Sequence, residues 1–214
     1  MEQSNTKEEF NAAYKQGVPW TYTKPSKELI DLVKSGKVSP CKTLEVGCGE
    51  GYNSIYLASV GFQVTSIDWS DVAIQLSKQH AKEADVLMRL LQLNIADLDN
   101  MKEEFGFIFD WRFFHDIVDP AKREKYVLSV KNLLSKRGKY LSVSFSEKST
   151  LFGLGKIRRN PRFGIDVYFA SMKELEKLFS KYFKIIEKKE IILPERKDRS
   201  NTPVIANYFF MKKT

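Results

Sequence analysis

One stretch decides how this chain folds: Leu44-Glu45-Val46-Gly47-Cys48-Gly49-Glu50-Gly51-Tyr52-Asn53. The apolar run that leads into it, residues 43–46, is typical of a buried parallel strand, and the pattern that leaves it, residues 53–58, is helical. The alternating glycines let the backbone turn tightly and let a ligand lie against the main chain. The next strand-like run, residues 62–67, ends in Asp68, whose carboxylate suits a ribose diol. This order of elements indicates a βαβ unit that binds a nucleoside.

The spacing of the glycines indicates which nucleoside is bound. Dinucleotide-binding folds use G-x-G-x-x-G and hold a pyrophosphate at the helix N-terminus. Here the spacing is G-x-G-x-G, and Glu45 stands two residues before Gly47. A carboxylate at that place would repel a pyrophosphate but favours a ligand that carries an amine and a sulfonium. A nicotinamide-dependent oxidoreductase is therefore the disfavoured alternative.

Residues 45–51 closely resemble the signature loop of the class I S-adenosylmethionine-dependent methyltransferases. The resemblance implies S-adenosyl-L-methionine as cofactor and S-adenosyl-L-homocysteine as product. In this family the residue that ends strand three, here Asn94, hydrogen-bonds the adenine amino group. The backbone of the next residue, here Ile95, helps to recognise the edge of the ring. For Asn94 the alternative is that it simply caps the strand end. The cofactor-binding residues that we expect are Trp20, Glu45, Gly47, Cys48, Gly49, Gly51, Asn53, Asp68, Trp69, Asn94, Ile95 and Asp110.

The chain as a whole resembles the branch of that family with thiopurine S-methyltransferases and halide or thiol methyltransferases. Residues 17–20 are similar to its Pro-Trp segment, which in the family closes over the cofactor. Residues 109–115 are similar to its motif after strand four, with Trp111 at a position that commonly holds Tyr or Arg and faces substrate. Residues 166–175 resemble a late segment that has lost its two prolines here but keeps an aromatic residue, Tyr168. The resemblance implies substrate-side roles for Trp111 and Tyr168.

Two further residues have alternative roles. His115 has an unperturbed pKa near 6.5, so it is a candidate base, but it equally suits a backbone hydrogen bond in a helical turn. Trp20 either covers the cofactor or anchors the N-terminal segment in the core. Together with residues 111–115 and the basic, glycine-containing loop 147–168, Trp20 is expected to roof the pocket, and the loop is expected to be poorly ordered without ligand.

Strand-like and helical runs alternate along the chain, which predicts a doubly wound α/β fold with a seven-stranded, mostly parallel sheet and an antiparallel last strand. The expected long loop covers residues 147–166, and the last two strands are expected at 183–186 and 204–211. We predict a single domain over 1–214, in which 1–36 form a helical lid segment, 37–146 the cofactor core and 147–214 the substrate side.

Composition excludes several classes of protein. The 214 residues are 43% hydrophobic without any run of 18 apolar residues, so no membrane span is expected. The polar N-terminus lacks a signal peptide's features, which predicts a cytoplasmic protein. Only Cys41 and Cys48 are present and no His cluster exists, so no metal site is expected. The net charge of +8 indicates either an ordinary solvated surface or recruitment of anions by residues 156–162.

We therefore expect a methyltransferase that acts on a small-molecule acceptor, through a thiol or another soft nucleophile. We expect it to be a monomer or a homodimer, without a membrane partner. Methyl transfer requires an in-line arrangement of nucleophile, methyl group and sulfur, and a soft nucleophile needs little acid–base help. The alternatives are an RNA or protein methyltransferase, or a non-catalytic S-adenosylmethionine-binding protein. Nucleic acid is the less favoured partner because no Asn-Pro-Pro-Tyr-type motif follows strand four.

Overall fold

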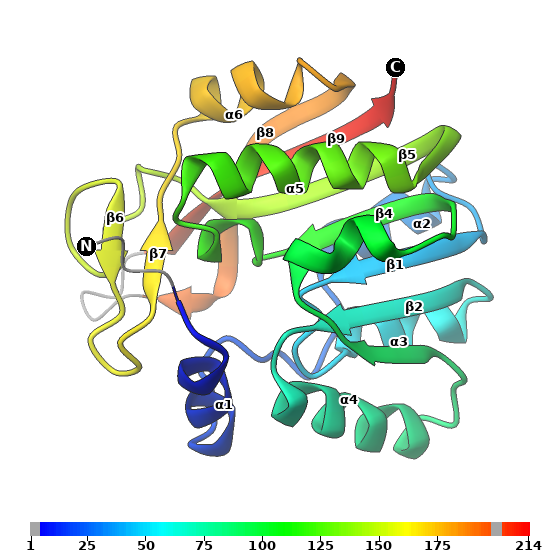
Figure 1. Cartoon of the computed structure of the whole chain (residues 1–214), viewed down its shortest axis with the longest axis horizontal. Coiled ribbons are helices and arrows are strands. Elements are labelled where there is room, and N and C mark those ends of the chain that lie inside the picture. Colours follow the sequence, from blue (N-terminus) through cyan, green and yellow to red (C-terminus); the bar gives the residue numbers. More distant parts are fainter. Residues whose placement is uncertain (1–4, 198–202) are drawn as a thin grey trace.

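A seven-stranded sheet forms the centre of the molecule, with its strands in the order β3-β2-β1-β4-β5-β9-β8 (Figure 1). The computed structural model describes residues 5–197 and 203–214. The strands of this sheet are β1 (Lys42–Val46), β2 (Gln63–Asp68), β3 (Arg89–Gln92), β4 (Phe105–Trp111), β5 (Leu134–Phe145), β8 (Phe183–Lys197) and β9 (Pro203–Lys213). Strands β1 to β5 pair in parallel, and β9 runs antiparallel to both β5 and β8. The predicted doubly wound sheet with an antiparallel last strand is confirmed.

Helices cover both faces of the sheet. They are α1 (Lys7–Lys15), α2 (Lys27–Lys34), α3 (Tyr52–Ser59), α4 (Asp71–Glu83), α5 (Pro120–Leu133) and α6 (Met172–Phe179), with short 3-10 turns η1 (Ile95–Asn100) and η2 (Phe114–Asp116). Successive residues of a strand face opposite sides. Phe107 and Phe109 of β4 accordingly join the core under α2 and α3, whereas Ile108 joins the core under α5 and α6. Figure 1 shows α5 lying across the front of the sheet and α2 and α3 behind it.

Helix starts follow from local sequence signals. Ser171 caps α6 in a capping box with Glu174, as its spacing predicts. The Asp119 side chain accepts from the Lys122 backbone N–H, and Pro120 occupies the first turn of α5, where a missing N–H costs nothing. These caps satisfy backbone donors that have no partner within the helix.

Strand β8 is longer than the strand predicted from the sequence. The predicted strand ends at residue 186, but β8 continues to Lys197 and pairs with β9 along this extension. The run Glu187-Lys188-Lys189-Glu190 looks like a polar connection, but β8 is one of the two edge strands of the sheet. An edge strand tolerates charged side chains because one side faces water. Its position at the edge is a property of topology that local pattern does not encode.

The predicted long loop contains a second, two-stranded sheet. Strands β6 (Ile157–Arg159) and β7 (Asp166–Tyr168) pair antiparallel, so the expectation of an irregular segment over 147–166 is wrong in this part. Arg158 of β6 is buried, and its guanidinium donates to the carbonyl oxygens of Glu147, Ser149, Leu151 and Gly155. One buried arginine thereby holds the carbonyl groups of the preceding turns together.

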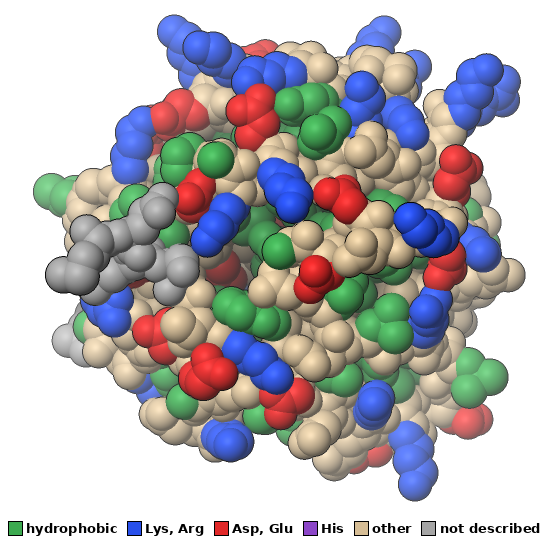
Figure 2. All heavy atoms as spheres, viewed as in Figure 1, with side chains coloured by type: hydrophobic (Ala, Val, Ile, Leu, Met, Phe, Trp, Pro, Cys, Tyr) green, Lys and Arg blue, Asp and Glu red, His purple; other side chains and the backbone are tan. Residues whose placement is uncertain are grey.

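The surface shows mixed charge. Figure 2 shows Lys and Arg side chains interspersed with Asp and Glu side chains on the face that it presents. Within the described residues, every helix is too short or too polar to span a bilayer. In the same part of the chain, His, Cys, Asp and Glu side chains form no group of three or more that could hold a metal ion.

The topology fixes where a ligand site can form. Strands β1 to β4 are parallel, so their carboxyl ends, at Val46, Asp68, Gln92 and Trp111, lie along one edge of the sheet. The strand order reverses between β1 and β4. In open α/β sheets the crevice at such a reversal is where ligands bind.

Candidate functional site

A cavity of about 960 Å³ opens at this edge of the sheet. That volume lies near the upper end of the roughly 300–1,000 Å³ typical of small-molecule sites. Of the predicted site residues, the following line it: Trp20, Glu45, Gly47, Cys48, Gly49, Gly51, Asn53, Asp68, Trp69, Asn94, Ile95, Trp111 and His115.

The glycine loop after β1 is closely packed against neighbouring side chains. Gly47, Gly49 and Gly51 all have positive φ angles, of 70°, 53° and 83°. A Cβ on Gly47 would lie 2.5 Å from Cγ of Phe113, and one on Gly49 would lie 2.8 Å from the Tyr14 hydroxyl. These positions therefore need glycine both for backbone conformation and for space.

Asp68 ties the glycine loop to the end of β2. One of its carboxylate oxygens accepts from the Gly49 N–H at 2.9 Å, and the other accepts from the Ser70 N–H at 2.9 Å. Each oxygen has two lone pairs, so the carboxylate can still accept hydroxyl groups from a ribose. Burial raises the pKa of Asp68 to about 6, and the two backbone donors oppose that rise.

Glu45 lies beneath the loop, almost fully buried. It accepts a short hydrogen bond from the Ser54 hydroxyl, which in turn lies 2.6 Å from the Ser66 hydroxyl. Burial raises the pKa of Glu45 to about 8, with a further contribution from Asp68. Two buried carboxyl groups with raised pKa values would be stabilised in their charged forms by a cationic ligand and destabilised by an anionic one. The groups present at this end of the cavity therefore fit S-adenosylmethionine better than a pyrophosphate.

Asn94 and Ile95 follow β3 at the next strand end. The Asn94 side-chain oxygen accepts from the Ala96 N–H at 2.9 Å and caps η1. This is the capping role weighed for Asn94 from the sequence, and it coexists with a place in the cavity wall. Trp69 also lines the wall, and its carbonyl accepts from the Gln92 side chain at 3.2 Å.

The N-terminal segment closes one side of the cavity through polar contacts. The Asn53 side chain accepts from the Ser26 N–H at 2.9 Å, and Thr21 donates to Glu50 at 2.6 Å. Trp20 meets Phe163 edge-on with ring centres 5.1 Å apart, and its indole N–H donates to the Tyr14 hydroxyl at 3.4 Å. Trp20 therefore lies beside the glycine loop and, at the same time, packs against the core.

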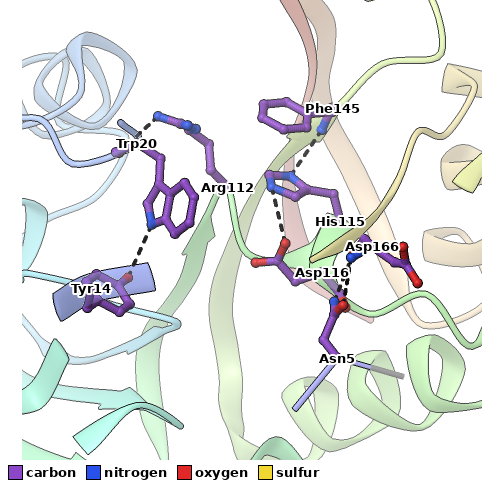
Figure 3. A network of polar contacts seen from close by, with 8 residues as sticks. All are labelled: Asn5, Tyr14, Trp20, Arg112, His115, Asp116, Phe145 and Asp166. Atoms are coloured by element: carbon purple, nitrogen blue, oxygen red, sulfur yellow. Dashed lines mark hydrogen bonds and ion pairs between the residues drawn. The ribbon is translucent and has the colours of Figure 1, made fainter. Parts of the chain in front are cut away.

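His115 accepts a hydrogen bond rather than presenting a free base. Its Nδ1 accepts from the Phe145 N–H at 3.4 Å, and its ring stacks on the Phe145 ring with centres 3.9 Å apart (Figure 3). With Nδ1 accepting, the neutral ring carries its proton on Nε2, which lies 3.7 Å from Asp116. The geometry agrees with the backbone-bonded alternative weighed from the sequence.

Arg112 and Asn5 were not among the predicted site residues. Arg112 follows β4, and its guanidinium donates to the Trp20 carbonyl at 3.2 Å (Figure 3). The Asn5 side chain donates to the carbonyl oxygens of Asp116 and Asp166 and so joins η2 to β7. Both residues line the cavity.

Asp110 and Tyr168 are not brought to the cavity. The Asp110 carboxylate is fully buried beside the sheet and accepts hydrogen bonds from the hydroxyls of Tyr126, Tyr140 and Ser142. Tyr168 is buried under the guanidinium of Arg123, which lies 3.7 Å from the ring centre. Both side chains are part of the packed interior in this structure. Asp110 and Trp111 are successive residues of β4, so their side chains point to opposite faces of the sheet.

The chain is similar to known proteins in both sequence and fold. Residues 37–193 match the model of a family described as "Methyltransferase domain". The chain is 31% identical over 133 residues to a 2-heptyl-1-hydroxyquinolin-4(1H)-one methyltransferase of Mycobacteroides abscessus, a match that covers 60% of this chain and 56% of that protein. It is 28% identical over 131 residues to a probable thiol methyltransferase 2 of Arabidopsis thaliana, covering 59% of this chain and 56% of the relative. The chain thus matches about half the length of these curated relatives.

Among solved structures, the fold is similar to that of Burkholderia thailandensis 1,6-didemethyltoxoflavin-N1-methyltransferase with bound 1,6-didemethyltoxoflavin and S-adenosylhomocysteine. The TM-score is 0.76 at 17% sequence identity, and the match covers 97% of this chain and 87% of the other. At that identity the likeness concerns the fold.

Proposed function

The chain belongs to the family of S-adenosylmethionine-dependent methyltransferase domains, and from this premise we propose that it transfers the methyl group to a small apolar acceptor through a soft nucleophile such as a thiol. When bound, S-adenosylmethionine supplies an electrophilic methyl group on a sulfonium. The observation that carries the proposal is one cavity with two chemically different ends. The glycine-loop end has carboxyl groups, and the apolar end is formed by residues from β5, β8 and the 147–168 segment, which includes β7.

The glycine-loop end is assigned to the donor. In this proposal the Asp68 carboxylate accepts the ribose hydroxyls, and Asn94 with the Ile95 backbone binds the adenine edge. Glu45 and the glycine-loop backbone face the amino acid part of the donor, where a carboxylate attracts the amine. Each of these residues lines the same cavity at successive strand ends. This arrangement orients the donor through groups held rigidly by the sheet.

The apolar end is assigned to the acceptor. Its wall includes Phe145, Phe152, Ile165, Val167 and Leu193. Such a wall favours a small apolar molecule and excludes water from the reacting atoms, since hydrophobic surface gains by being covered. Two relatives, named for a hydroxyquinolinone and for thiols as acceptors, support a small-molecule acceptor.

The basic run 156–162 gives little support to an RNA substrate. Lys156 pairs with Glu174, Arg159 pairs with Asp166 at 3.1 Å, and Arg158 is buried on carbonyl groups. Cations that are already paired or buried contribute less to binding a phosphate backbone, which requires free Lys and Arg side chains. The mixed charge in Figure 2 agrees with this conclusion.

The hydrogen bond that His115 accepts favours a nucleophile that needs no strong base. An alcohol or amine acceptor must lose a proton to a group positioned for general base catalysis. In the neutral His115 ring, Nδ1 accepts from the Phe145 N–H and Nε2 carries the proton, so this histidine is arranged to donate rather than to accept. A thiol ionises at an unperturbed pKa near 8.5 and can react as its own thiolate.

The proposal is tested by incubating the protein with radiolabelled S-adenosylmethionine and a panel of small thiols, amines, phenols, halides and total RNA. We expect incorporation into one or more apolar thiols and none into RNA. Incorporation into RNA alone would exclude the small-molecule proposal. Binding of S-adenosylhomocysteine without methylation of any acceptor class, with total cell protein included as a further arm, would favour the non-catalytic alternative.

A further inference from the structure

Arg112 is a buried cation in the cavity wall. It follows β4 in a left-handed backbone conformation, with φ of 65°, which costs a residue other than glycine free energy. Only 9% of the residue is exposed. The left-handed turn redirects the chain at the end of β4, and the side chain reaches toward Trp20 (Figure 3). A strained backbone that places a buried charge at a ligand cavity points to a function for that charge.

The Arg112 guanidinium is incompletely satisfied. It offers five N–H donors, and one of them donates to the Trp20 carbonyl at 3.2 Å. Its Nε is buried and has no hydrogen-bond partner among the described residues. The Tyr22 hydroxyl, in the same cavity wall, is also buried; it lies close enough to the Arg112 side chain to act on its charge through a hydrogen bond, and within the described part of the chain no other partner contacts it. Buried polar groups normally have partners because leaving them unpaired is costly.

The Arg112 guanidinium and Tyr22 lie together in the cavity wall. The Arg112 guanidinium carbon lies 4.9 Å from the centre of the Tyr22 ring and 5.7 Å from the centre of the Phe145 ring. Within the described residues, Arg112 forms no ion pair with a carboxylate. The Asp116 carboxylate acts on the charge of Arg112 from a distance, and Asp116 itself lies 3.7 Å from His115. Burial lowers the pKa of Arg112, but an arginine stays charged at neutral pH.

We propose that Arg112 and the Tyr22 hydroxyl bind an anionic group of the methyl acceptor, so that the acceptor is an apolar molecule that carries a negatively charged oxygen or sulfur. This inference rests on the proposed function, because it places the acceptor at the apolar end of the cavity. An anion there would receive the free Nε–H and the Tyr22 O–H, and its charge would compensate the buried guanidinium. The surrounding apolar side chains would strengthen this interaction by excluding water.

The charge on the acceptor has two possible sources, which the same residues would recognise. It is either a carboxylate separate from the reacting atom or the ionised nucleophile itself. Benzoate carries only the first kind of group, and thiophenolate carries only the second, while benzamide is a neutral molecule of similar shape. Binding of these three probes therefore separates the sources from each other and from simple apolar contact.

The test is a titration of each probe into the protein saturated with S-adenosylhomocysteine, for the wild type and the variants Arg112→Gln, Tyr22→Phe and Arg162→Gln. Arg162 is the matched control, because it is an exposed arginine that also donates to the N-terminal segment, at the Gly17 carbonyl. We expect the wild type to bind at least one of the two anions about tenfold or more tightly than benzamide, since hydrogen bonds to charged groups are the strong ones. This preference should be lost in Arg112→Gln, reduced in Tyr22→Phe and kept in Arg162→Gln.

Equal binding of the anions and benzamide by the wild type would overturn the inference, and so would an equal loss of preference in Arg112→Gln and Arg162→Gln. S-adenosylhomocysteine affinity, measured first on every variant, reports whether the variant is folded. If Arg112→Gln does not fold, Tyr22→Phe decides alone, because it removes a single hydroxyl. Failure of the wild type to bind S-adenosylhomocysteine would refute the proposed function itself, whereas normal binding without anion preference would refute only this inference.

Discussion

Replacement of Gly47 by Ala tests how the glycine loop is built. Two costs are expected. The left-handed backbone at φ of 70° costs a residue other than glycine about 1–2 kcal/mol. The new Cβ would also lie 2.5 Å from Cγ of Phe113, and overpacking of this kind typically costs about 1–3 kcal/mol. The free energy of unfolding should therefore fall by about 2–5 kcal/mol.

Gly36 provides the matched control for this substitution. Its φ is 69°, and a Cβ there would meet nothing within 4 Å. Gly36→Ala should therefore carry the backbone cost alone, about 1–2 kcal/mol. The two variants are compared by urea denaturation, in which the midpoint and the slope give the free energy of unfolding.

The contribution of Phe113 can be isolated by a double-mutant cycle. If the Phe113 ring is the obstacle, Gly47→Ala should cost about 1–3 kcal/mol less in a Phe113→Ala background than in the wild type. Because Phe113 lines the cavity, Gly47→Ala should also weaken S-adenosylhomocysteine binding, and Gly36→Ala should not. Equal losses of stability in Gly47→Ala and Gly36→Ala would refute the reasoning.

Three further predictions concern single side chains. Asp68→Ala should weaken S-adenosylhomocysteine binding by about 1–3 kcal/mol in titration calorimetry, since ribose hydroxyls lose their acceptor. Asp110→Asn should leave that affinity unchanged but alter the pH dependence of stability. Burial raises the wild-type pKa of Asp110 from 3.8 to about 6, so the folded state binds this proton more tightly than the unfolded state does. The free energy of unfolding of the wild type should therefore fall by about 3 kcal/mol relative to the variant as pH rises from about 4 to above 6. His115→Asn keeps an acceptor for the Phe145 N–H, so kcat/KM for a thiol acceptor should change little, and its pH profile should follow the pKa of the thiol in both proteins.

Each of these predictions has a control or a contradicting result. Asp71→Ala is the control for Asp68, because it removes a half-exposed carboxylate from the first turn of α4. Parallel stability curves for the wild type and Asp110→Asn would show that Asp110 does not titrate in that range. A hundredfold loss of kcat/KM in His115→Asn, together with loss of one ionisation from the pH profile, would identify His115 as a general base.

The donor end of the cavity is largely predictable from the sequence, and the acceptor end is not. The glycine loop and Asp68 belong to one local βαβ unit, so strand, turn and helix signals within 25 residues define them. Arg112 and Tyr22 lie in segments 90 residues apart and meet only through the tertiary fold. The left-handed conformation of Arg112 has no local sequence signature, because it depends on how β4 ends against β5.

The motifs predicted places in the cavity for Asp110 and Tyr168, and the structure buries both side chains elsewhere. Asp110 belongs to a motif that resembles the family, but the pleat of β4 directs its carboxylate to buried hydroxyls rather than to the cavity. A residue's place in a motif indicates its strand end, and the phase of the strand decides which face it reaches. Tyr14 is the converse case: its position in α1 gives no functional signal, yet its hydroxyl lies against the Gly49 turn.

The central claim is that one cavity holds the donor at the glycine loop and the acceptor at the apolar end. A crystal structure of the protein with S-adenosylhomocysteine tests this claim most directly. We predict that the ribose hydroxyls bind Asp68, that the adenine lies beside Asn94 and Ile95, and that the sulfur points toward the part of the cavity lined by Trp20 and Arg112. S-adenosylhomocysteine bound with its adenine against Phe145 and Leu193, or bound outside this cavity, would contradict the claim.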